Sequence, residues 1–128
     1  MPERILVAED QLHMRKLVEV KLKALGFEVV GVADGLAAYE SAQKMLPDLI
    51  ILDVMMPLMT GFEVLSKLKK KETTKHIPVI LVTAQSNEHE ILHGLDLGAD
   101  EYITKPFSPN ELAARVKKVL ASRTQKPT

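Results

Sequence analysis

The chain has 128 residues, and its 17 lysines and arginines balance 17 aspartates and glutamates, so its formal net charge is zero. This length suits one domain, and the balanced charge provides no overall field that would attract nucleic acid or an anionic membrane. The absence of cysteine excludes disulfides and thiolate metal sites. No apolar run approaches the length of a membrane span, and the N-terminus meets charge too early for a secretory signal. We therefore expect a cytoplasmic domain that binds neither nucleic acid nor membrane directly.

Five short apolar runs alternate with longer amphipathic segments, and they predict strands at residues 4–9, 27–33, 48–53, 77–83 and 101–104. Between them, apolar side chains recur at helical spacing. The first helical segment carries them at Met14, Leu17, Val18, Leu22 and Leu25, and the last at Leu112, Val116, Val119 and Leu120. This alternation predicts an α/β fold whose parallel sheet is covered on both faces. The first, third and fourth strands are the most aliphatic, so we place them centrally and the short fifth strand at an edge.

Residues with specific capping roles mark the ends of the predicted helices. The starts are indicated by Thr60 with Glu63 and by Ser108 with Glu111, at capping-box spacing, and by Pro109. The ends are indicated by Gly26, Pro47 and Gly98. The folded domain is predicted to cover residues 1–122. Residues 123–128 are predicted to form a polar tail or the start of a linker.

Chemically active side chains follow several of the predicted strands. In an open α/β sheet, ligands bind beyond the carboxyl ends of the strands, at the point where the strand order reverses. The first strand ends at Glu9 and Asp10, the third at Asp53, the fourth at Thr83, and the fifth is followed by Lys105. A single acidic residue at a strand end is more often a helix cap than a ligand. Their joint placement is what predicts a shared site.

Carboxylates that share a site repel one another, and a hard divalent cation relieves that repulsion. Carboxylates with a backbone carbonyl, here that of Met55, form a ligand set suited to Mg²⁺. Lys105 would add a positive charge and Thr83 a hydroxyl donor, which together with the metal form a receptor for a phosphoryl group. Asp53 ends the most apolar strand, so it is the best placed nucleophile for covalent phosphoryl transfer.

Two alternatives from other classes remain open at this point. One is a Mg²⁺-dependent phosphohydrolase that works through an aspartyl-phosphate; such enzymes usually carry a second aspartate where this chain has Met55. The other is a zinc hydrolase, because His89, Glu90 and His93 match the H-E-x-x-H pattern. No histidine follows His93 to complete a zinc site. We expect Ile91, Leu92 and Leu95 to form the apolar face of this helix, which would leave both histidines in solvent.

The chain resembles the receiver domain of bacterial two-component response regulators over about residues 3 to 121. The segments that carry the resemblance are "ILVAED", "LIILDVMMPLMTGFEVL", "IPVILVTA", "GADEYITKPF" and "SPNELAARV". The resemblance implies a three-layer, doubly wound (βα)5 sandwich of the chemotaxis-type, flavodoxin-like fold, with a five-stranded parallel sheet in the order 2-1-3-4-5. It also implies a signalling domain, not an enzyme, that assists its own phosphorylation and dephosphorylation.

The resemblance further implies roles for the residues at the strand ends. Asp53 would accept phosphate, and Mg²⁺ would be bound by Asp10, Asp53 and the Met55 carbonyl, with Glu9 acting mainly through water. Lys105 would pair with the phosphoryl oxygens. Thr83 and the backbone N–H of Ala84 would also bind the phosphate. Tyr102 would move inward together with Thr83 as a switch, and Pro106 would follow a cis peptide bond.

Partners are implied by the same resemblance. The phosphate donor would be a sensor histidine kinase or a histidine phosphotransfer protein, and the receiver would act on an output domain or a target protein. The candidate donor-docking residues are Met14, Arg15, Val18, Pro106 and Phe107. Their alternative role is packing in the core or toward solvent, and for Val18 this alternative carries equal weight. The predicted readout face comprises the fourth helix, the fifth strand and the fifth helix, with His89, Ile91, Leu95, Tyr102 and Lys117 exposed on it. A phosphorylation-dependent homodimer is one further expectation.

Overall fold

The computed structural model describes residues 2–84 and 88–125, in which strands and helices alternate as the sequence predicts. The strands are β1 (Arg4–Ala8), β2 (Glu28–Val32), β3 (Leu49–Asp53), β4 (Val79–Ala84) and β5 (Glu101–Lys105). The helices are α1 (Leu12–Ala24), α2 (Gly35–Met45), α3 (Gly61–Lys69), α4 (Glu88–Asp96) and α5 (Pro109–Gln125). None of the described helices is both long and apolar enough to cross a membrane.

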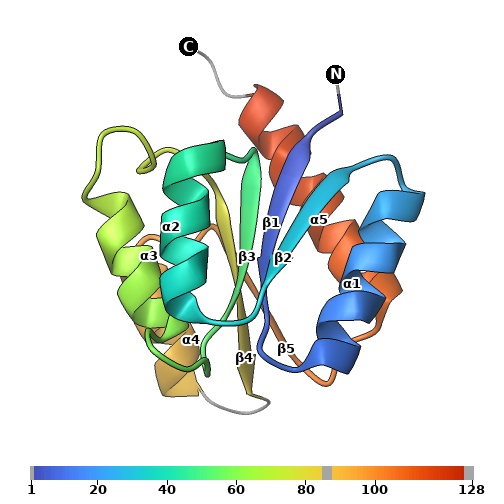
Figure 1. Cartoon of the computed structure of the whole chain (residues 1–128). Coiled ribbons are helices and arrows are strands. Elements are labelled where there is room, and N and C mark those ends of the chain that lie inside the picture. The colour runs from blue at the N-terminus through green and yellow to red at the C-terminus, as the bar shows by residue number, and fades with distance from the viewer. Residues whose placement is uncertain (1, 85–87, 126–128) are drawn as a thin grey trace.

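The five strands form one parallel sheet in the order β2-β1-β3-β4-β5, which confirms the predicted topology and the edge position of β5. Helices α1 and α5 cover one face of the sheet, and α2, α3 and α4 cover the other (Figure 1). The fold is therefore a three-layer, doubly wound sandwich. The strand order reverses between β1 and β3, so the carboxyl ends of these two strands flank the point where such folds bind ligands.

The core consists of two apolar clusters, one on each face of the sheet. Because side chains alternate along a strand, Ile5 and Val7 of β1 belong to the cluster under α1 and α5, while Leu6 and Ala8 belong to the other. Every residue of β3 is buried, as expected for a central strand covered on both faces. This strand is a rigid support for Asp53 at its end.

Two helices depart in part from the buried face that the apolar spacing predicts, although α1 buries Val18 and Leu22 as expected. In α1, Leu17 is 42% exposed, whereas Glu19 is buried, because Gly31 on β2 has no side chain where the Glu19 carboxylate lies. In α4, the prediction that Leu92 and Leu95 form the buried face is wrong. Leu92 is 60% exposed, because α4 packs against β4 through the buried Gly94, which leaves no room for a side chain beside Leu81.

The helix ends follow the capping signals. Gly26 and Gly98 have positive φ angles of 97° and 107°, which glycine adopts without strain, and Thr60 and Glu63 form a complete capping box. Helix α5 continues to Gln125, past the predicted domain end at residue 122, so the first three residues of the predicted tail are helical. The Arg123 guanidinium donates to the Asp48 carbonyl at 2.9 Å, which ties this last turn to the sheet. Residues 126–128 lie outside the described part of the chain.

Candidate functional site

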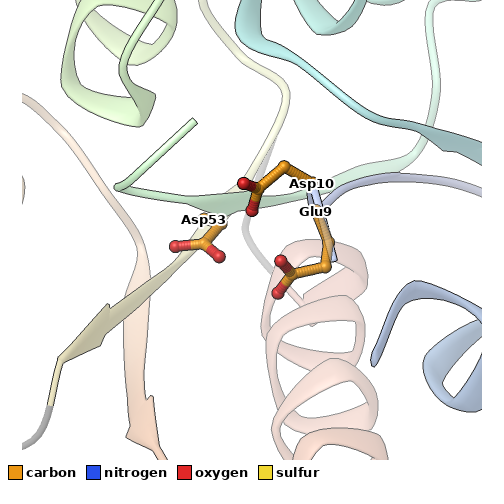
Figure 2. Close-up of side chains that lie close together, drawn as sticks. All are labelled: Glu9, Asp10 and Asp53. Atoms are coloured by element: carbon orange, nitrogen blue, oxygen red, sulfur yellow. The ribbon is translucent and has the colours of Figure 1, made fainter. Parts of the chain in front are cut away.

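The carboxyl ends of β1 and β3 bring three carboxylates together. Glu9 and Asp10 follow β1, Asp53 ends β3, and one carboxylate oxygen from each lies within 4.8 Å of the others. Figure 2 shows the three side chains gathered at this edge of the sheet. Glu9 and Asp53 are each only 4% exposed, whereas Asp10 is exposed. The site therefore combines two buried negative charges with a third that remains open to solvent.

Lys105, at the end of β5, supplies the compensating positive charge. Its Nζ lies 2.6 Å from Asp53 Oδ2 and 3.0 Å from Glu9 Oε1. Burial lowers the pKa of Lys105, but hydrogen bonds and charge attraction from Asp53 and Glu9 outweigh this effect, so its pKa is raised. Lys105 therefore stays protonated at neutral pH and bridges the two buried carboxylates. In this arrangement Glu9 contacts Lys105 directly.

Asp53 is held by its own loop as well as by Lys105. Its Oδ1 accepts a hydrogen bond from the Met55 backbone N–H at 3.1 Å, which fixes the plane of the carboxylate. The backbone beneath it is closely packed, because a Cβ on Gly61 would lie 2.5 Å from the Asp53 carbonyl oxygen. The sequence did not predict this role of Gly61. The role depends on a close contact between the Gly61 backbone and the backbone at the end of β3, which only the folded structure shows.

Thr83 lies on β4, between β3 and β5, with its side chain 1% exposed. Its Oγ1 is buried and has no hydrogen-bond partner among the described residues. Buried hydroxyls are normally paired, so one without a partner near a buried charged site indicates a group positioned for a ligand. Ala84, the last residue of β4, is exposed beside it.

Thr83→Val is expected to leave the metal-free, unphosphorylated protein as stable as the wild type or more stable by about 1 kcal/mol, because it replaces an unpaired hydroxyl with a methyl group. Thermal or urea unfolding measures this difference. Thr83→Ser is the matched control, since it keeps the hydroxyl and removes the methyl group. A loss of more than about 1 kcal/mol in Thr83→Val would mean that the hydroxyl already has a partner.

The remaining predicted residues are placed as follows. The Lys105–Pro106 peptide bond is cis. Tyr102 on β5 is half-buried, and its carbonyl accepts a 2.6 Å hydrogen bond from Arg115. Of the predicted donor-docking residues, Pro106 is exposed and Met14 and Phe107 are half-buried.

Two predicted docking residues point inward. Of the two interpretations of Val18, core packing is confirmed and docking is wrong, because Val18 is 3% exposed and belongs to the core under α1. Arg15 is half-buried and donates a hydrogen bond to the Glu9 carbonyl at 2.8 Å. The direction of this side chain depends on the β1–α1 loop, which helical spacing alone does not specify.

The zinc alternative finds no support in the geometry. His89, Glu90 and His93 do lie on one helix, α4. The His93 ring, however, packs edge-on against Phe62, with the ring centroids 4.7 Å apart. Among the described residues, the one cluster of possible metal ligands is the acidic group of Glu9, Asp10 and Asp53.

Comparison with known proteins identifies the class to which this fold and site belong. The model of the response regulator receiver domain family matches residues 5–117, and the chain belongs to that family. It is 43% identical over 120 residues to the phosphate regulon transcriptional regulatory protein PhoB of Escherichia coli, an alignment that covers 94% of this chain and 52% of PhoB. It is also 43% identical over 126 residues to the probable transcriptional regulator ycf27 of Cyanophora paradoxa, covering 98% of this chain and 51% of that protein.

Solved structures agree with this family. A response regulator from Chloroflexus aurantiacus superimposes with a TM-score of 0.90 at 34% identity, covering 94% of this chain and 99% of that one. The receiver domain of the sensor histidine kinase PA1611 from Pseudomonas aeruginosa, which has a magnesium ion coordinated in its active-site cleft, gives 0.86 at 28% identity, covering 94% and 99%. The chain spans about half the length of the curated relatives named above. It is a receiver domain of the two-component response regulators.

Proposed function

We propose that this domain accepts a phosphoryl group on Asp53 from a phosphohistidine of a sensor histidine kinase or a histidine phosphotransfer protein. The observation that carries the proposal is the Lys105 ammonium 2.6 Å from Asp53, beside two further carboxylates. This contact places a fixed positive charge beside the proposed nucleophile. A buried ion pair is often no more stabilising than a well-packed apolar core. A lysine and two further acidic residues around one buried aspartate therefore support a functional role.

The donor set suits Mg²⁺. Asp10 and Asp53 would bind the ion through their side chains and Met55 through its backbone carbonyl, with Glu9 contributing through water; carboxylate, carbonyl and water oxygens are the ligands that Mg²⁺ prefers. The exposure of Asp10 leaves the site open to solvent on one side. When bound, the ion supplies positive charge that neutralises the carboxylates and polarises a phosphoryl oxygen.

In the transfer step, an Asp53 carboxylate oxygen attacks phosphorus, a P–O bond forms, and the P–N bond to the donor histidine breaks. The electron pair of that bond stays on the histidine ring, which takes up one proton from solvent and leaves as neutral imidazole. The Lys105 ammonium, which lies 2.6 Å from the carboxylate in the unphosphorylated structure, would pair with a phosphoryl oxygen after transfer. The Thr83 hydroxyl and the Ala84 N–H would donate to the others, and Thr83 thereby gains the partner that it lacks.

Hydrolysis of the acyl phosphate by water would restore the carboxylate and release inorganic phosphate, so the domain assists its own phosphorylation and dephosphorylation without acting as an enzyme on a separate substrate. The alternative of a dedicated phosphohydrolase is less favoured. Such enzymes usually carry a second aspartate where this chain has Met55, whose side chain is exposed at the rim.

Phosphorylation would act through a pre-existing two-state equilibrium in which Thr83 and Tyr102 move together. The face that changes would be that of α4, β5 and α5. On this face His89, Leu95 and Lys117 are exposed, whereas Ile91 and Tyr102 are half-buried. The signal would pass to an output domain or a target protein, or to a second phosphorylated copy. Transcriptional regulators about twice as long as this chain support an attached output domain, and a cytoplasmic location is part of the proposal.

The experiment that tests the proposal is intact-mass spectrometry after incubation with acetyl phosphate and Mg²⁺. The wild type is expected to gain the mass of one phosphoryl group. Asp53→Asn is expected to gain none, because an amide cannot form the acyl phosphate. Asp96→Asn, which changes an exposed aspartate on α4, is the matched control and is expected to react as the wild type does. Equal phosphorylation of Asp53→Asn would overturn the assignment.

A further inference from the structure

All four hydrogen-bonding groups of Glu9 are engaged. Its backbone N–H donates to the Val32 carbonyl at 3.0 Å, and its carboxylate meets Lys105 at 3.0 Å through Oε1 and the Gln11 N–H at 3.0 Å through Oε2. The fourth group, the backbone carbonyl, accepts the 2.8 Å hydrogen bond from Arg15 Nη1. Glu9 is therefore fixed on every side, and Arg15 fixes the carbonyl.

The carboxylate of the next residue, Asp10, is not held in this way. Its side chain is exposed, and within the part of the chain that the structure describes no hydrogen bond or ion pair holds its carboxylate. The position of this carboxylate depends on the peptide group that joins Glu9 to Asp10. That peptide group contains the Glu9 carbonyl, so the Arg15 hydrogen bond restrains the plane from which Asp10 projects.

The path of the Arg15 side chain explains why it reaches this carbonyl instead of solvent. The stem crosses β2 at Gly31, where a Cβ would lie 3.2 Å from Arg15 Cδ. The same Cβ would collide with the carboxylate of Glu19, the residue one turn further along α1. Gly31 thus leaves a flat strand surface on which the aliphatic part of Arg15 lies while its guanidinium extends to the β1–α1 loop.

We propose that Arg15 is a positioning residue for the divalent-cation site, acting through the Glu9–Asp10 peptide group on the Asp10 carboxylate. This inference rests on the proposed function, because it assigns Arg15 to the same site. Groups that orient metal ligands without touching the metal commonly change metal affinity by about 10- to 100-fold when they are removed. Arg15 is such a group, because it donates a hydrogen bond to the Glu9 carbonyl and would not itself touch the ion.

The charge of Arg15 alone predicts the opposite change in Mg²⁺ affinity when Arg15 is removed, so the two explanations can be distinguished by experiment. A guanidinium near a cation site repels the cation, so its removal would strengthen Mg²⁺ binding if Arg15 acted only through its charge. If Arg15 acts by positioning Asp10, its removal weakens binding. A purely structural role would lower the stability of the metal-free protein and leave the affinity of the folded fraction unchanged.

The test is calorimetric titration of the full chain with MgCl₂. Arg15→Met keeps the stem and removes the donor, and it is expected to raise the Mg²⁺ dissociation constant about 10-fold. Arg15→Lys keeps a charged donor and is expected to stay within about threefold of the wild type. Arg4→Met is the matched control, because Arg4 Nη1 makes the same kind of bond, 2.7 Å to the Met45 carbonyl, before the start of β3. It is expected to leave the affinity unchanged.

Arg15→Gln removes the charge while keeping a polar side chain. It is expected to weaken Mg²⁺ binding to the same extent and provides the test if Arg15→Met does not fold. Binding by the folded Arg15 variants as tight as that of the wild type, or tighter, would overturn the inference. Failure of the proposed function would look different. A wild-type protein that shows no Mg²⁺ binding at all would overturn the metal site itself, together with the role of Arg15.

Discussion

Lys105→Ala is expected to lower the free energy of unfolding of the metal-free protein by about 3 kcal/mol, because it leaves the buried carboxylates of Asp53 and Glu9 without their shared counter-charge. Both carboxylates are 4% exposed, and both lie within 3.0 Å of the lysine nitrogen. Urea unfolding in the presence of a chelator measures the loss. Lys118→Ala is the control, since Lys118 makes an exposed ion pair with Glu101 at 3.4 Å and is expected to change stability by less than about 1 kcal/mol.

The electrostatic origin of this loss has two further consequences. Asp53→Asn added to Lys105→Ala is expected to restore part of the lost stability, because it removes one of the two unpaired charges. Mg²⁺ is expected to stabilise Lys105→Ala more than it stabilises the wild type, since the cation no longer competes with the ammonium for Asp53. Equal losses in Lys105→Ala and Lys118→Ala would show that the Lys105 bridge does not stabilise the fold.

Gly61→Ala is expected to disturb the backbone that carries Asp53. Its Cβ would lie 2.5 Å from the Asp53 carbonyl oxygen and 3.0 Å from Val54 Cα, both backbone atoms that cannot rotate away. The start of α3 or the end of β3 must then shift, and we expect a loss of about 3 kcal/mol in unfolding free energy. Because Asp53 would move with its backbone, phosphorylation by acetyl phosphate should slow by about 10- to 100-fold.

The control for Gly61→Ala is Gly98→Ala, at the turn between α4 and β5. Gly98 has a φ of 107°, so alanine there is strained, and the expected loss is about 1 to 2 kcal/mol. The atoms that its Cβ would meet belong to the flexible Lys69 side chain, at 3.4 Å or more. Phosphorylation should therefore proceed at the wild-type rate. A Gly61→Ala protein that is phosphorylated as fast as Gly98→Ala would contradict the idea that this packing positions Asp53.

The sequence predicted the fold and the clustering of the acidic residues for one physical reason. In a parallel sheet every strand runs in the same direction, so the residues after the strands meet at one edge. The uniformly apolar strand before Asp53 identified a central position, and the strand-end residues Glu9, Asp10 and Lys105 could be assigned to the same site without coordinates.

What the sequence could not predict depends on contacts between segments that are distant in the chain. Helical spacing placed Leu17 in the core, but the flat surface of Gly31 allows Glu19 to be buried instead. The same kind of contact, Gly94 beside Leu81, turns Leu92 of α4 to solvent.

The ion pairs at the site were equally hidden from the sequence. That Lys105 bridges Glu9 as well as Asp53 is a matter of side-chain geometry, because the residues at the ends of β1, β3 and β5 allow several pairings. Residue spacing does not distinguish these pairings, since it fixes where a strand ends and not which of its neighbours a side chain meets.

A crystal structure of the wild type grown with MgCl₂ would show whether the ends of β1 and β3 hold one divalent cation beside the proposed nucleophile Asp53. We expect a bound ion with oxygens of Asp10, Asp53 and the Met55 carbonyl at about 2.1 Å and water oxygens as its other ligands. The Lys105 ammonium should remain within reach of Asp53. An ion bound elsewhere, or an acidic cluster that stays bridged by Lys105 alone at saturating Mg²⁺, would contradict this expectation.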